Sequence, residues 1–409
     1  MIKSEYDKRT PGRFGSQPID ISVPVLILGG KENSLSLTRS LARAGISASV
    51  SGPGDCWGMY SKYCKTCYRV PTGDKPEHFW QKLLLGTKPL INDRHVILPC
   101  CDASIAFLAE NEETLRQRFI FDGGSKQQRM ALLDKRKTLE MADAADVATP
   151  KYWPVEQGGE LDGRFTDCKF PVIVKPLNTF KFAKVFSKKF LVAETGIDEL
   201  KTKIRMAHDK GFDVTVTEKI PGPDTQLSSY YTYVDDDGRF LFHFTKRIIR
   251  RFPENSGGAT YHATQWLPET ADQGIKFFKK TGFRGLGNIE FKRDTRDGKL
   301  KIMEVNARFT AAQELAVRAG APIDLIVYCQ LTGQKIPSFS TYENDLRFWY
   351  PIKDFLAMMQ LRRMGKITFS GWLRELRGHR TVSPLIDSGD RKPYSRVANS
   401  LFKKVLASR

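Results

Sequence analysis

The sequence predicts a mixed protein, α/β in its first part and α+β after it, with a parallel sheet first and antiparallel hairpins later. Residues 23–28 form an apolar run that ends at Gly29-Gly30. A helical pattern follows over residues 34–44, and a second strand begins at residue 48. This strand–turn–helix–strand order is typical of a parallel unit with helices on its faces. Residues 288–308 instead alternate apolar and polar positions around a polar turn, which indicates an antiparallel hairpin.

Length and composition indicate a globular protein of several domains. The chain has 409 residues, of which 41% are hydrophobic and 27% charged. A single compact core is not expected at this length. No apolar run reaches about 18 residues, as a membrane span requires, and residues 1–19 lack the apolar stretch of a signal peptide. We therefore expect a cytoplasmic protein.

The chain is strongly basic. Its 65 Lys and Arg residues against 46 Asp and Glu residues give a net charge of +19, and such a field attracts polyanions. Residues 352–366 combine an apolar helical stripe with basic positions. Such a helix usually packs on its own domain, and contact with an anionic membrane is the alternative. No nucleic-acid-binding motif accompanies the charge, so nucleic acid is the weaker hypothesis.

The hairpin at residues 288–308 carries two carboxylates that alternation places on one face. Glu290 shares that face with Glu304 when the strands are joined by an odd-numbered loop centred on Asp297, whereas a two-residue turn would pair Glu290 with Val305. Like charges on paired strands repel each other, and a divalent cation held with substrate phosphates would remove that repulsion. An ordinary hairpin with solvated charges fits this segment equally well. The same alternation predicts that Met303 lies in the core.

Three further segments stand out upstream of the hairpin. The pattern predicts one helix over residues 127–145 that includes Asp134-Lys135, and a buried strand over residues 170–176 that includes Lys175 near its end. A third strand, residues 214–220, stops at the Pro-Gly-Pro-Asp sequence of residues 221–224. A lone lysine near a strand end is usually solvent-exposed, so none of these segments identifies a site by itself.

Taken in order, these segments resemble the ATP-grasp superfamily, and most closely its carboxylate–amine ligase branch, which includes D-aspartate-ligase-like proteins. The resemblance covers roughly residues 23–335. It is strongest over residues 285–320, where Glu290 and the sequence Glu304-Val305-Asn306-Ala307-Arg308 are similar to the acidic strand and E-x-N-x-R signature. Alanine stands at 307 where proline is common in the family, and this departure removes no metal ligand.

The resemblance implies an ATP-grasp fold: a Rossmann-like parallel-sheet domain followed by two α+β lobes that clasp ATP. Lys135 and Lys175 would neutralise the phosphates as point charges. The adenosine would lie against a hinge between the lobes. The residues implied at this hinge are Glu218, Lys219, Ile220 and Asp224.

The same resemblance implies a metal site and catalytic arginines. The metal is expected to be Mg²⁺, with Mn²⁺ as the alternative. Its implied ligands are Glu290, Glu304 and Asn306. Arg308 would neutralise charge on the transferred phosphoryl group. A second arginine, Arg250 or Arg251, would clamp the substrate carboxylate, and the basic cluster around them leaves that choice open.

The implied reaction joins a small-molecule carboxylate to an amine through an acyl phosphate, with ATP converted to ADP. One alternative is carboxylation like that of biotin carboxylase, although the sequence has no Met-Lys-Met carrier segment. Another is a degenerate ATP-grasp protein that binds nucleic acid or an anionic membrane surface. The intact Glu290 and Glu304 argue against degeneracy.

The expected organisation has five parts. Residues 1–22 are a flexible lead, 23–125 a pre-ATP-grasp domain, 126–225 a small lobe with the lysines and hinge, 226–338 a large lobe with the metal and phosphate site, and 339–409 a basic helical extension. That extension could contact the inner face of the membrane or a lipid-linked acceptor. The oligomeric state is left open, with a homodimer as one option.

Overall fold

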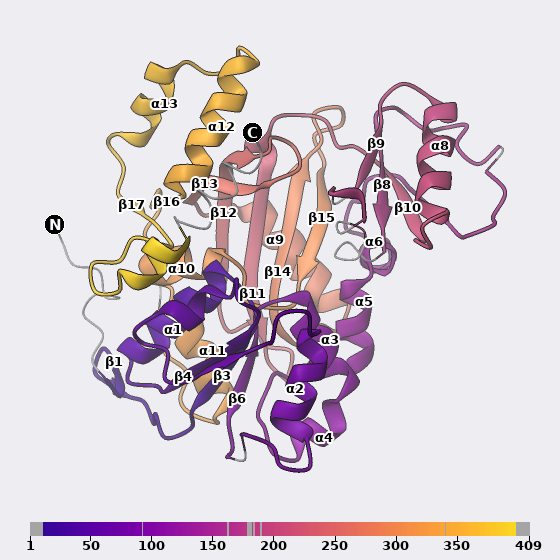
Figure 1. Ribbon diagram of the computed structural model, residues 1–409. Helices are drawn as coiled ribbons and strands as arrows, with labels where there is room; N and C mark the ends of the chain where they lie inside the picture. The colour runs from indigo at the N-terminus through magenta and orange to yellow at the C-terminus, as the bar shows by residue number, and fades with distance from the viewer. Residues whose placement is uncertain are drawn as a thin grey trace.

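The computed structural model describes residues 11–91, 93–161, 163–177, 182, 185–188, 190–339 and 341–397. Within these ranges the chain forms a four-stranded parallel sheet, a four-stranded antiparallel sheet, a seven-stranded and mostly antiparallel sheet, and the helices that cover them (Figure 1). The predicted mixed fold is confirmed. No helix in the described ranges is long and apolar enough to cross a membrane.

The N-terminal sheet is parallel, with the strand order β5-β4-β3-β6. Its central strand β3 is buried on both faces, as expected for a parallel strand covered by helices. Helix α1 packs on one face together with α10 and α11, while α2, α3 and α4 pack on the other. The elements of this part are β3 (Val25–Leu28), α1 (Glu32–Arg43), β4 (Ala48–Gly52), η1 (Trp57–Tyr60), β5 (Cys67–Arg69), α2 (Pro76–Leu85), β6 (Val96–Pro99), α3 (Asp102–Glu110), α4 (Glu112–Arg116) and α5 (Lys126–Leu133).

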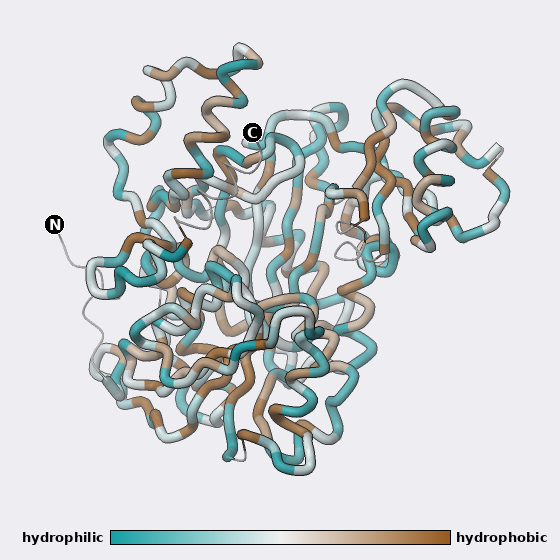
Figure 2. Tube along the Cα trace, in the orientation of Figure 1, coloured by the Kyte–Doolittle hydropathy of each residue, from teal (hydrophilic) through white to brown (hydrophobic). Residues whose placement is uncertain are grey.

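A smaller antiparallel sheet with the order β7-β10-β8-β9 follows in sequence. Helix α8 covers one of its faces, and their shared core forms a hydrophobic cluster separate from the rest. In Figure 1 this unit stands apart from the main body, and its strands carry continuous hydrophobic stretches (Figure 2). The elements are α6 (Lys135–Ala144), β7 (Tyr152–Val155), β8 (Val172–Pro176), β9 (Leu191–Ala193), α8 (Ile197–His208) and β10 (Val214–Glu218).

The large sheet has the order β15-β14-β11-β12-β13-β16-β17 and is antiparallel except at its β16–β17 edge. One face of β11, β14 and β15 packs on α9, α5 and α6. Its elements, with the adjoining helices, are η2 (Asp224–Gln226), β11 (Leu227–Val234), β12 (Phe244–Phe252), β13 (Gly258–Thr264), α9 (Pro268–Lys280), β14 (Gly285–Arg293), β15 (Leu300–Asn306), α10 (Ala312–Arg318), α11 (Ile323–Leu331), β16 (Arg347–Trp349) and β17 (Thr381–Val382).

The ends of the described chain are folded onto this body. Residues 11–22, predicted as a flexible lead, contain the hairpin β1 (Arg13–Phe14) and β2 (Gln17–Pro18), and Ile19 is buried in the core. Helices α12 (Pro351–Arg363) and α13 (Phe369–Leu376) project from the end of the large sheet that lies away from the parallel sheet (Figure 1). Phe355 and Phe369 are about half exposed there, at 45% and 44%. Peripheral membrane contact through this region stays a prediction.

Candidate active site

Two carboxylates face each other across the β14–β15 pair. Glu290 lies opposite Glu304, and Asn288 lies opposite Asn306. Ile289 and Val305, which alternate with them, are buried on the other side of the sheet. We call the side that carries Asn288, Glu290, Glu304 and Asn306 the site face. The predicted pairing of the two glutamates is confirmed, and their mutual repulsion makes this face a natural position for a cation.

The loop and the strand register that produce this pairing differ from the predicted ones. The strands are joined through residues 294–299 rather than by an odd loop centred on Asp297, and a β-bulge lies between the Phe291–Ile302 and Glu290–Glu304 pairs. The bulge adds Met303 to one strand, as bulges do. Ile302 therefore takes the core position predicted for Met303 and is fully buried. The extra residue corrects the register, so the glutamates still meet.

Lys135 is held against Glu304 by a break in the helix before it. The predicted single helix is wrong, because Asp134 adopts an extended conformation and separates α5 from α6. The Asp134 carboxylate accepts hydrogen bonds from the backbone N–H groups of Arg136 and Lys137, as an N-cap does. Lys135 thus becomes the first residue of α6, and its ammonium group donates to the Glu304 carboxylate. Burial lowers the pKa of Lys135, but Glu304 outweighs burial and the net pKa is raised.

Lys175, near the end of β8, points toward the same charges from the small sheet. The pKa of Lys175 is lowered to about 8, mainly by burial and also by the positive charge of Lys135, while the Glu304 carboxylate partly opposes both. An anion that binds beside a lysine with such a pKa would stabilise the charged form of that lysine. The two predicted phosphate-binding lysines are therefore brought together beside the carboxylate pair.

Arg308 links this site to the N-terminal sheet. Its Nε donates to Oδ1 of Asp102 at 2.8 Å, and Asp102 begins α3 just beyond the carboxyl end of β6. Ligands of open α/β sheets bind at that edge. Asp102 and Arg308 line one pocket together with Ile105, Arg129, Leu132, Leu133, Lys135, Glu304, Val305, Asn306 and Ala307. The structure thus gathers Lys135, Glu304, Asn306 and Arg308 around one opening.

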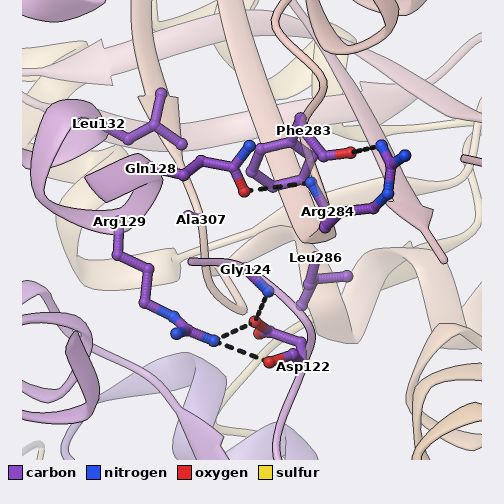
Figure 3. A pocket seen from close by; sticks show the side chains of 9 residues that line it. All are labelled: Asp122, Gly124, Gln128, Arg129, Leu132, Phe283, Arg284, Leu286 and Ala307. Carbon is purple, nitrogen blue, oxygen red and sulfur yellow. Dashed lines mark hydrogen bonds and ion pairs between the residues drawn. The ribbon is translucent and has the colours of Figure 1, made fainter. Parts of the chain in front are cut away.

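A second pocket, which shares Arg129, Leu132 and Ala307 with the first, shows how α5 is fixed. Arg129 lines both pockets and is 2% exposed. Figure 3 shows its guanidinium meeting Asp122, with Nη2 2.5 Å from Oδ1 and 2.8 Å from the backbone carbonyl. A buried pair of this kind is costly to break. It pins α5 to the segment after α4 and thereby sets the position of Lys135.

The predicted hinge lies outside this pocket, at the end of β10. Glu218 is 5% exposed and accepts from Nη2 of Arg296 at 3.1 Å, while the Lys219 N–H donates to the Pro171 carbonyl at 3.2 Å. Lys292, two residues beyond Glu290 on β14, donates from Nζ to the Ile220 carbonyl at 3.0 Å. Lys292 therefore ties the hinge to the strand that carries the carboxylates. Strand alternation places it on the same face as Glu290, but the sequence predicted no role for it.

Asp224, which follows the hinge in sequence, lies close to Arg251. Asp224 is 6% exposed, its Oδ2 accepts from the Asn255 N–H at 3.1 Å, and its Oδ1 lies 3.7 Å from Nη1 of Arg251. Arg251 also donates from Nε to the Gly257 carbonyl at 2.6 Å. Both residues therefore lie beside the hinge and not among the residues that surround Glu304.

Arg250, a predicted substrate clamp, is not brought to the site. Its guanidinium forms a two-pronged pair with Asp354 of α12, at 2.9 and 3.0 Å, and also contacts Glu375 of α13. The pairing between β12 and β13 is irregular on both sides of Arg250, so strand alternation does not predict the direction of its side chain. Arg250 holds the C-terminal helices in this structure, and the expectation that it anchors substrate stays a prediction.

The fold matches that of solved ATP-grasp structures, which confirms, at the level of the fold, the resemblance found in the sequence. No protein-family model matches the chain. A structure of N5-carboxyaminoimidazole synthetase from Staphylococcus aureus complexed with ADP matches with a TM-score of 0.58 and 15% identity, over 81% of each chain. L-amino acid ligase from Bacillus licheniformis matches with a TM-score of 0.54 and 14% identity, over 76% of this chain and 74% of the other.

Among curated proteins, the chain is similar to D-aspartate ligase from Enterococcus faecium (strain Aus0004). The two are 24% identical over 254 residues, which covers 58% of this chain and 60% of the relative. The match thus spans less than two thirds of the relative's length. The roles assigned above to individual site residues stay predictions.

Proposed function

We propose that the chain is an ATP-dependent ligase that activates a small-molecule carboxylate as an acyl phosphate and joins it to an amine. The observation that carries the proposal is the Glu290–Glu304 pair with Lys135, Lys175 and Arg308 around it. Paired carboxylates beside several cations suit phosphoryl transfer, in which positioning and charge neutralisation supply most of the catalysis. The similarity to a D-aspartate ligase and an L-amino acid ligase supports amide formation as the second half of the reaction.

The site face fits Mg²⁺ held jointly with phosphates. Among the described residues, no group of three or more His, Cys, Asp or Glu side chains could hold a metal ion unaided. Two carboxylates and one amide are hard oxygen donors, and Mg²⁺ is typically bound by one or two carboxylates plus substrate phosphates. The ammonium of Lys135 on Glu304 shows that this carboxylate accepts a cation. Glu290, Glu304 and Asn306 would hold the metal, which neutralises phosphate charge when bound.

The protein's own groups would then position two successive displacements. A carboxylate oxygen of the substrate attacks the γ-phosphorus of ATP, and the bond to the departing ADP oxygen breaks. The amine nitrogen next attacks the acyl carbon, loses a proton, and releases inorganic phosphate. Lys135, Lys175 and Arg308 face the developing negative charge on the phosphates. Asp102 keeps Arg308 oriented toward the pocket.

Phosphate release from MgATP with a panel of amino acids, small carboxylates and amines tests this proposal. We expect release that requires one carboxylate and one amine together, with an amide as product. Bicarbonate belongs in the panel, because release that needs bicarbonate alone would favour the carboxylation alternative. ATP hydrolysis that no pair in a broad panel stimulates would contradict the ligase assignment.

The pKa of Lys175 predicts the pH dependence of nucleotide binding. The lysine is charged below its pKa of about 8 and neutral above it, so the phosphates lose a counter-charge as the pH rises. Affinity for ADP, measured by calorimetry without divalent cations, should fall by up to about tenfold between pH 7 and pH 9. The variant Lys175→Arg stays charged over this range and should give a flat profile. An equally steep decline in that variant would assign the effect to another group.

A further inference from the structure

A buried lysine continues the row of charges across the site face. Glu290 lies opposite Ser229 on β11, and Ser229 in turn lies opposite Lys246 on β12. Directly paired residues on neighbouring strands project from the same face of a sheet. Neighbouring strands are about 4.8 Å apart, so the backbone of Lys246 lies about 10 Å from that of Glu290. Lys246 therefore borders the same space as the carboxylate pair but at a distance from it.

Lys246 lacks the partner that a buried cation normally has. Its side chain is 6% exposed, and within the described part of the chain its ammonium has no hydrogen bond or ion pair. Burial lowers the pKa of Lys246, Glu290 partly opposes this, and Arg251 lowers it further. Buried charges are usually paired, because desolvation is costly. A position that keeps an unpaired lysine therefore indicates that the partner comes from outside the chain.

His262 on β13 supplies a second unsatisfied group next to Lys246. It lies opposite Ile248, two residues along β12 from Lys246 on the same face. The ring is 2% exposed, and neither ring nitrogen has a hydrogen-bond partner. Burial and the charge of Lys246 hold the pKa of His262 well below its usual value. A neutral imidazole offers one donor and one acceptor, and Phe348 packs edge-on against it at 4.6 Å between ring centroids.

We infer that Lys246 and His262 bind a second carboxylate of the substrate, separate from the one that is activated. This inference rests on the proposed function, because the activated carboxylate must lie beside the phosphates at Glu290, Glu304 and Arg308. A lysine and an imidazole N–H together satisfy a carboxylate with charge-assisted hydrogen bonds. The separation of Lys246 from Glu290 leaves room for a short carbon chain between the two groups. The substrate class is therefore dicarboxylic, such as an acidic amino acid.

The test compares dicarboxylic amino acids with their amides. Aspartate and glutamate are measured against asparagine and glutamine, first as substrates with MgATP and an amine, then by calorimetric binding to the ADP-loaded protein. Wild type should prefer the dicarboxylates. In Lys246→Met, the KM for the dicarboxylates should rise and the affinity for them should fall, each by about 10- to 100-fold. This is the change expected when a hydrogen bond to a charged group is lost. The monocarboxylate values should change little.

Matched variants separate this role from a structural one. Arg247→Met removes the adjacent positive charge from the opposite face and should leave both substrate classes unaffected. His262→Phe should weaken dicarboxylate binding, and His262→Gln, which keeps a donor, should restore part of it. Lys246→Met should keep ADP binding and melt at or above the wild-type temperature, because it removes an unpaired buried charge. A lower melting temperature would assign Lys246 a structural role and overturn the inference.

The outcomes also separate this inference from the proposed function. Absence of any carboxylate–amine reaction would contradict the proposed function itself. A working ligase whose dicarboxylate KM is unchanged in Lys246→Met would overturn the subsite alone. If Lys246→Met raised only the KM of the amine, the subsite would belong to the amine's carboxylate, and the inference as stated would be wrong.

Discussion

Replacing Glu304 with glutamine is expected to lower ATP turnover by at least about 1000-fold. Glutamine keeps the size and one oxygen but removes the charge that would bind the metal and that pairs with Lys135. Loss of a single preorganised charge at a phosphoryl-transfer site typically costs that much in rate. The measurement is phosphate release under the conditions that give maximal wild-type turnover.

Stability should hardly change in the same variant. The Lys135 and Glu304 side chains are 26% and 40% exposed, and partly exposed ion pairs contribute at most about 1 kcal/mol. Glu269→Gln is a matched control, because Glu269 pairs with Arg293 on the surface next to β14, away from the site face. That variant should retain full turnover. Substantial turnover in Glu304→Gln would refute the role of this carboxylate.

The pairing behind this prediction was visible in the sequence because it is local. Glu290 and Glu304 belong to one hairpin, and the apolar alternation of Ile289 and Val305 restricts which side chains can share a face. The bulge at Met303 was not predictable in the same way. It depends on how the whole hairpin packs on α9, α5 and α6, and strand alternation carries no signal for an inserted residue.

Contacts between distant segments could not be predicted. Asp102 orients Arg308 across 206 positions of sequence, and neither residue signals the other in a single sequence. Lys246 and His262 become neighbours only because β12 and β13 pair with a particular register. The sequence thus indicated the types of group at the phosphate site, whereas the residues around the expected substrate emerged from tertiary structure.

Arg250 is a second case in which a single sequence did not reveal the contact that a residue makes with a distant segment. Its place in a basic cluster suggested a substrate clamp, yet its partner is an aspartate 104 positions away in α12. Asp354 is fully buried and has further donors besides the Arg250 guanidinium. These are the Thr260 hydroxyl at 2.9 Å, the Trp349 indole at 3.1 Å and the Trp372 indole at 2.8 Å. Asp354 is therefore the point at which β12, β13, β16, α12 and α13 are joined.

Asp354→Ala is accordingly expected to destabilise the protein by about 3–5 kcal/mol, because it leaves the buried Arg250 charge and several donors unsatisfied. At about 2–4 °C per kcal/mol, the melting temperature should fall by roughly 6–20 °C. Hydrogen exchange should show the loss of protection concentrated in α12 and α13. Asp237→Ala, which breaks an exposed pair with Arg239, should cost less than about 0.5 kcal/mol.

The double variant Asp354→Ala/Arg250→Met decides between a structural and a substrate role for Arg250. If Arg250 is only structural, removing its charge as well should recover part of the lost stability, because no uncompensated cation remains. Arg250→Met alone should then lower the melting temperature while the KM values of the folded enzyme stay near wild type. A normal melting temperature together with a sharply raised KM would instead restore Arg250 as a substrate clamp. It would also mean that the Asp354 pair opens during turnover.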